Sequence, residues 1–183
     1  MRSEKLSNSR MTMRNMWGWL ATAFLIFHFS FLISCTSIDC PVQNLVYTKY
    51  ALKKADGTTD TLKTDTLWIL TRRADGTDTL LLNALCGDKA TGFNLQISYT
   101  QPEDVFITLL TDTAGYGYID TIRIKKENYP HFESVDCQVS YFHEITAVST
   151  THNAFDSIAI HHSSVNYDTS NDHLYLYVKK NRH

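Results

Sequence analysis

The chain has 183 residues, with 17 basic against 19 acidic side chains and a formal net charge of −2. This length suits a single domain preceded by a leader. The basic residues form scattered pairs rather than a stripe, so nucleic acid is not an expected partner. Seven glycines and three prolines are too few to indicate a disordered chain.

Residues 1–34 have the pattern of a secretory signal. The segment opens with four basic residues, from Arg2 to Arg14, and continues with an apolar run from Trp17 to Phe31. That run is shorter than the roughly 20 residues a membrane-spanning helix needs. A basic start, a short apolar stretch and a small residue before the cut predict cleavage and export.

The end of this segment indicates lipid attachment. Leu32-Ile33-Ser34-Cys35 resembles the bacterial lipobox, in which the cysteine is acylated and becomes the mature N-terminus. Several acyl chains would hold the protein firmly on a bilayer, because each buried CH₂ contributes about 0.8 kcal/mol. The alternative is an ordinary signal peptide with a coincidental cysteine. Thr36 follows Cys35 in place of the Asp that retains some lipoproteins in the inner membrane, which favours the outer membrane. The acidic cluster that marks surface export in some lineages is also missing, which favours the side that faces the periplasm.

Cleavage would leave residues 35–41 as a lipidated N-terminus and short tether, and residues 42–183 as one domain. Removal of the leader takes away four basic residues and one acidic residue, so 13 basic and 18 acidic residues remain, a net charge of −5.

We expect two partners for the processed protein. One is the membrane, contacted through the N-terminal lipid, and the other is another envelope protein.

Short stretches of alternating apolar and polar residues recur along the domain, rich in β-branched and aromatic side chains. They predict strands over residues 45–50, 62–71, 77–82, 94–99, 105–110, 118–125, 138–148, 155–161 and 173–178.

Turn signals separate these stretches. Asp56-Gly57 and Asp75-Gly76 lie in similar phrases and predict two tight turns, since both residue types accept positive φ. Pro130 and the polar stretch Asn166–Asp172 are further expected breaks. Regularly spaced short strands predict an all-β fold, an antiparallel two-sheet sandwich that is immunoglobulin-like or related.

Four cysteines are present. If Cys35 is acylated, then Cys40, Cys86 and Cys137 remain, and thiols outside the cytosol tend to pair. One of the three must be left over.

The order of several short motifs resembles that of a family of small, uncharacterised Bacteroidota envelope lipoproteins. The motifs are Cys40-Pro41, Ser98–Pro102, Pro130-His131-Phe132, Val135-Asp136-Cys137, Phe142–Ile145, Asp156–Ile158 and Val165–Asp168. The resemblance implies a lipid-anchored, β-rich domain and supplies no catalytic residues.

Cys40 and Cys137 lie in motifs shared with that family, whereas Cys86 does not. The resemblance therefore implies a Cys40–Cys137 disulfide and leaves Cys86 as a free thiol, which we expect to be buried. Closing so long a loop would stabilise the domain by roughly 4–5 kcal/mol.

Metal binding is one alternative function. His143-Glu144 and His161-His162 are adjacent pairs, and neighbours on a strand point to opposite faces, so each pair offers one ligand per face. His143 and His161 could meet across neighbouring strands and bind a transition metal. The Asp-rich turns could instead offer oxygen ligands to calcium, although no EF-hand loop is present.

A small hydrolase with an unrecognised site is the second alternative. No G-x-S-x-G motif occurs, and only Ser163-Ser164 beside two histidines, or Cys86 with a distant histidine, suggests a nucleophile. Tyr116 and Tyr118 could contact a ligand from a glycine-containing turn. The pattern as a whole favours a non-enzymatic binding or scaffolding module that needs no cofactor.

Overall fold

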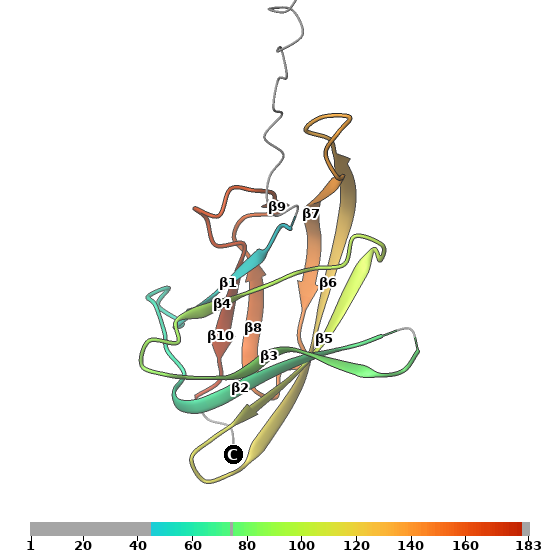
Figure 1. Cartoon of the computed structure of the whole chain (residues 1–183). Coiled ribbons are helices and arrows are strands. Elements are labelled where there is room, and N and C mark those ends of the chain that lie inside the picture. Colours follow the sequence, from blue (N-terminus) through green and yellow to red (C-terminus); the bar gives the residue numbers. More distant parts are fainter. Residues whose placement is uncertain (1–44, 74, 181–183) are drawn as a thin grey trace, which may run out of the picture. The chain divides into compact units, whose positions relative to one another are not determined.

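Ten β-strands and no helix make up the regular structure of residues 45–73 and 75–180, the part that the computed structural model describes. The strands form two sheets of four and six (Figure 1). The predicted all-β, two-sheet architecture is therefore confirmed. The expected leader, its cleavage site, Cys35 and Cys40 lie outside the described residues.

The smaller sheet has the strand order β4-β1-β10-β8. Its central pair, β1 and β10, is parallel, with Tyr50 opposite Leu174, while the other pairs are antiparallel. The first and last strands of the described chain thus lie side by side. The bounds are β1 Thr48–Lys53, β4 Gly92–Leu95, β8 Phe155–Ile160 and β10 Leu174–Val178.

The larger sheet has the order β3-β2-β5-β6-β7-β9 and is antiparallel throughout. Strand β6 is the longest, at 15 residues, and extends past the end of β5 to form a long hairpin with β7 (Figure 1). The bounds are β2 Lys63–Arg72, β3 Asp78–Gly87, β5 Glu103–Thr111, β6 Gly117–His131, β7 Ser140–Ser149 and β9 Ser164–Val165.

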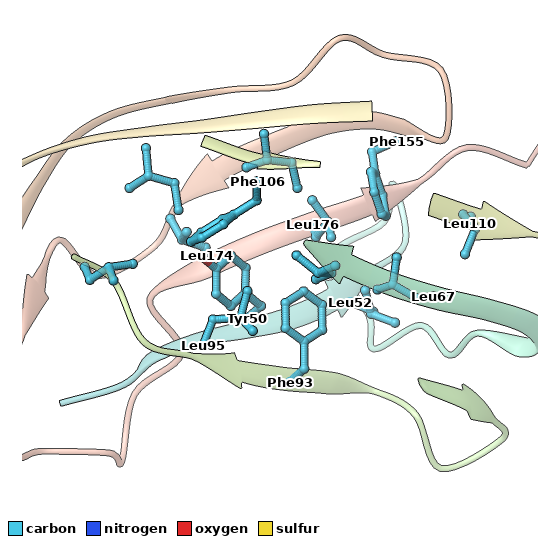
Figure 2. Packing of buried hydrophobic residues seen from close by; sticks show 14 of the residues in the cluster. Tyr50, Leu52, Leu67, Phe93, Leu95, Phe106, Leu110, Phe155, Leu174 and Leu176 are labelled. Atoms are coloured by element: carbon cyan, nitrogen blue, oxygen red, sulfur yellow. The ribbon is translucent and has the colours of Figure 1, made fainter. Parts of the chain in front are cut away.

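The core lies where apolar faces of the strands meet. Along β2, Leu67 and Ile69 are buried, as the period-2 pattern predicts. Tyr50 of β1 stacks on Phe93 of β4, with ring centroids 4.6 Å apart, and Figure 2 shows both rings among the core leucines. Packing of this kind stabilises the fold by roughly 1.5–3 kcal/mol for each large apolar side chain removed from water.

Gly92 lets β4 approach β1 closely. A Cβ atom at this position would lie 2.3 Å from the Tyr50 carbonyl oxygen, which is too close for any side chain. The glycine is therefore required by the contact between the two backbones.

The two predicted Asp-Gly turns form as expected. In each, the aspartate accepts hydrogen bonds from the backbone and hydroxyl of the threonine two residues on, and the glycine has φ near +80°. The turn at Asp75-Gly76 joins β2 to β3. The same backbone hydrogen bonds recur at residues 112–116, between β5 and β6, where Gly115 has φ +86°.

Asp120 of β6 ties the two sheets together. Its buried carboxylate accepts hydrogen bonds from the backbone N–H groups of Asn153, Ala154 and Phe155 and from the Thr151 hydroxyl, at 2.6–2.9 Å. Burial alone would raise the pKa of this carboxyl, but the four donors outweigh it and lower the pKa. The start of β8 is thereby fixed to β6.

Pro130 does not break the structure as expected, because it lies within β6 opposite Tyr141 of β7. The pairing of β6 with β5 ends at Lys125. Beyond that point β6 has one strand neighbour only, so a missing N–H donor is tolerated there. Pro130 therefore does not interrupt the β6–β7 hairpin.

Candidate functional site

A buried ion pair lies between β5 and β6. The Lys126 side chain is fully buried, and its Nζ lies 2.5 Å from Asp104 Oδ2 and donates to the Gln101 carbonyl at 2.8 Å. Both Asp104 oxygens accept the Ser98 backbone N–H. Burial raises the pKa of Asp104, and the Lys126 ammonium opposes that rise. The pair anchors residues 98–101 to the sheet.

Asn128 holds the same segment from the next inward position of β6. Its amide nitrogen donates to the carbonyls of Tyr99 and Gln101, at 3.1 and 3.0 Å, and its Oδ1 lies 2.7 Å from Nδ1 of His143. Since that oxygen can only accept, His143 Nδ1 is the donor. Burial, helped by the Lys126 charge, lowers the pKa of His143 to about 4, so the ring is neutral near pH 7.

The segment that these contacts hold, residues 98–101, lines an open cleft of about 1330 Å³. Tyr99, exposed at 58 %, stacks on Tyr141 of β7 with centroids 4.8 Å apart. The opposite side of the cleft is formed by Thr71 to Arg73, at the end of β2, and by Leu81 of β3. A concave surface with stacked aromatic rings and amide and hydroxyl groups is typical of a binding site.

Arg72 and Glu103, two further charged side chains that line the cleft, pair with neighbours. Arg72 forms a two-pronged ion pair with Asp78 at 2.8 and 3.1 Å, and Glu103 pairs with Arg123 at 3.3 Å. Both pairs are exposed, and each connects two adjacent strands. These two pairs therefore stabilise the strands around the cleft, whose lining combines tyrosine, amide and hydroxyl groups with aliphatic side chains such as Leu81 and Val139.

A second aromatic cluster lies at the loop end of the β6–β7 hairpin. His131 stacks on Phe142, with centroids 4.2 Å apart, and the Tyr167 ring meets Phe142 edge-on at 5.0 Å. The Tyr167 hydroxyl also shares a hydrogen bond with the Ser140 hydroxyl. The hairpin is thus held at the end next to its loop, where His131 pairs with Ser140 across the two strands.

The structure does not bring His143 and His161 together across neighbouring strands. His143 lies on β7 in the six-stranded sheet, whereas His161 directly follows β8 in the four-stranded sheet and stacks on Tyr175 at 4.3 Å. The His143 ring hydrogen-bonds to Asn128, and the His161 ring stacks on Tyr175. Residues 45–73 and 75–180 contain no group of three or more side chains arranged to hold a metal, which covers the Asp-rich turns as well.

The two candidate ligand-contacting tyrosines have different surroundings. Tyr116 is 63 % exposed in the turn between β5 and β6. Tyr118 packs partly against the core, and its hydroxyl lies 3.5 Å from Asp112 Oδ2. The two rings therefore do not form a shared binding surface, and neither borders the cleft.

Cys86 is a free thiol, but the expectation that it is buried is wrong. It lies near the end of β3, at the edge of the larger sheet, and is exposed. An edge strand has no neighbour to cover its far side. Cys137 lies in the loop between β6 and β7; its predicted partner Cys40 is outside the described residues, so the disulfide stays a prediction.

Asp104, Lys126 and Asn128 were missed from the sequence. A signal was present: Ile122, Ile124, Lys126 and Asn128 occupy alternate positions of one strand, and the first three are buried. Continuing that alternation would have placed Lys126 inward. By sequence alone, Lys125-Lys126 is only one of the scattered basic pairs.

The fold and the cleft define a class of protein: a small, two-sheet β domain with an open cleft at one end. The chain belongs to the Family of unknown function (DUF6452), whose model matches residues 66–178. That match confirms the expectation of an uncharacterised family. No curated protein and no solved structure matches the chain. Within the described part of the chain, no helix is long and apolar enough to cross a membrane.

Proposed function

We propose that this protein is a lipid-anchored bacterial envelope lipoprotein whose β domain binds another envelope protein through the cleft beside Tyr99 and Tyr141. The observation that carries the proposal is the cleft itself. Its volume of about 1330 Å³ exceeds the roughly 300–1,000 Å³ of sites that enclose small molecules. An open concavity of that size suits a segment of a macromolecule.

The wall of the cleft is organised for binding in advance of any partner. Lys126 and Asn128 hold the carbonyls of Tyr99 and Gln101, so the segment that carries Tyr99 is fixed in the free protein. Binding then needs little ordering of this wall, which favours affinity. Exposed tyrosines contribute large contact areas at low entropic cost and are enriched at protein interfaces.

The anchoring part of the proposal rests on the sequence of the leader. A basic opening, a short apolar run and Leu32-Ile33-Ser34-Cys35 support acylation of Cys35 after export, with the outer membrane facing the periplasm as the proposed location. The family resemblance to Bacteroidota lipoproteins supports the same placement. We further propose a non-enzymatic role, because the cleft's carboxylates are engaged in ion pairs with Lys126 and Arg123.

Site-specific photo-crosslinking in intact envelopes tests the binding role. A photoreactive phenylalanine analogue replaces Tyr99 in one variant and Tyr116 in the matched control; both tyrosines are exposed, and only the first borders the cleft. We expect a discrete crosslinked product with one envelope protein from position 99 alone. The same products from both positions, or crosslinks only to a second copy of this chain, would overturn the cleft assignment.

A further inference from the structure

The exposed apolar side chains of the domain gather at one end. Phe132, Val135 and Val139 belong to the β6–β7 loop, residues 132–139, with exposures of 65, 99 and 37 %. Leu45 and Tyr99, both exposed, line the same cleft as Val139. More than half of the exposed large hydrophobic side chains in the described residues lie at this end or on the adjacent part of β6.

Hydrogen bonds within the β6–β7 loop fix the conformation of its apolar tip. The Cys137 N–H donates to the Ser134 carbonyl at 3.2 Å, which closes a tight turn with Val135 as its first central residue. The Asp136 N–H reaches the Ser134 hydroxyl at 3.4 Å, and His131 pairs with Glu133 at 3.0 Å at the base of the loop. Val135 is thereby held outward, almost fully in water.

Chain length limits how far the proposed anchor can lie from this end of the domain, because Leu45 lines the cleft there. Leu45 follows Cys35 by ten residues, a stretch that spans at most about 33–36 Å when fully extended. If Cys40 is bonded to Cys137, only five residues separate the lipid-bearing cysteine from the loop, at most about 18 Å. With that disulfide, the acyl chains on Cys35 and the apolar loop would be close enough to reach the same bilayer surface.

We infer that the β6–β7 loop rests on the phospholipid bilayer, with Phe132 and Val135 inserted at the level of the headgroups. This inference rests on the lipid anchor of the proposed function. Apolar and aromatic side chains at a bilayer interface bury surface that water would otherwise cover. Glu133 and Asp136 flank them, so the surface that fits is zwitterionic lipid rather than a strongly anionic one.

This contact gives the cleft an orientation. Val139, the last residue of the loop, and Tyr141, two residues further on, both line the cleft. The cleft therefore opens beside the bilayer, and the partner it receives is one that lies at the membrane surface. The opposite end of β6, near Tyr116, points away from the lipid, about 45 Å along the strand (Figure 1).

The test uses the full acylated chain in phosphatidylcholine vesicles, some containing lipids brominated near the headgroup. Val135→Trp places a fluorophore at the loop tip, and Tyr116→Trp is the matched control at the other end of β6. The parent, whose only tryptophan after residue 34 is Trp68, supplies the background. We expect quenching of V135W at least about twofold stronger than that of Y116W, and weaker when anionic lipid is added.

Three outcomes would overturn the inference: equal quenching of both variants, stronger quenching with anionic lipid, or a blue-shifted but unquenched V135W. The last would mean that protein, such as a second copy of the chain, covers the loop. Failure of the anchor is distinguished separately, because the mass of the N-terminal peptide and the vesicle-bound fraction report it directly. An acylated, vesicle-bound chain with an unquenched loop refutes this inference alone.

Discussion

Removing Lys126 tests the structural basis of the cleft. The Lys126→Met variant keeps most of the side-chain volume but leaves the buried Asp104 carboxylate without its counter-ion. Lys126 is fully buried and Asp104 is nearly so, and breaking a buried pair from one side costs about 3–5 kcal/mol. Domains of this size are stabilised by about 5–15 kcal/mol in total, so the loss is large enough to measure without doubt.

Urea unfolding followed by the fluorescence of Trp68 is a suitable assay. For a slope of about 2 kcal/mol per molar, a loss of 4 kcal/mol lowers the unfolding midpoint by about 2 M. The matched control is Arg123→Met, which breaks the exposed pair with Glu103. Exposed pairs contribute about 0–1 kcal/mol, so its midpoint should move by less than about 0.5 M.

The double variant Asp104→Asn/Lys126→Met separates charge from packing. Asparagine is neutral and can still accept the Ser98 N–H, so at least half of the lost stability should return. A Lys126→Met variant no less stable than Arg123→Met would refute the reasoning. A double variant as unstable as the single one would show that the unpaired carboxylate is not the cause.

Three further outcomes follow from the structure. The folded-state pKa of His143, about 4, lies below the unfolded value of about 6.5. The free energy of unfolding of the parent therefore falls by about 3 kcal/mol as the pH drops from 6.5 to 4. His143→Gln should remove most of this pH dependence. A profile unchanged by the substitution would contradict that assignment. Asp120→Ala should lower the free energy of unfolding, measured by chemical denaturation, by more than about 3 kcal/mol, because several buried donors lose their acceptor. A decrease of less than about 1 kcal/mol would contradict this role of Asp120. Cys86 should react with a maleimide in the native protein, and Cys86→Ser should leave the melting temperature within about 2 °C; a thiol reactive only after unfolding would contradict its exposure.

Much of this fold could be predicted because its strands and turns have strong local sequence patterns. Alternation from Tyr118 to Lys125 and the apolar run from Val105 to Leu110 located two central strands, and the Asp-Gly dipeptides located two turns. All of these features depend on neighbouring residues alone. The two-residue strand β9 was missed, because Ser164-Val165 is too short to show a period.

The candidate site was less predictable because it depends on pairings between distant segments. Asp104 and Lys126 meet only through the register of β5 on β6, and Asn128 meets His143 only through the register of β6 on β7. Single-sequence reasoning assigns charged residues to the surface, which is correct for Arg123 and wrong for Lys126. The burial of Asp120 escaped notice for the same reason, since its donors lie more than thirty residues away.

The most direct test of the envelope assignment is the mass of the mature N-terminal peptide from the native host. The account predicts that the mature chain begins at Cys35 and carries acyl groups, and that Cys35→Ser releases the domain from the membrane fraction. An N-terminal peptide with an unmodified Cys35, or one that retains residues upstream of it, would contradict the account.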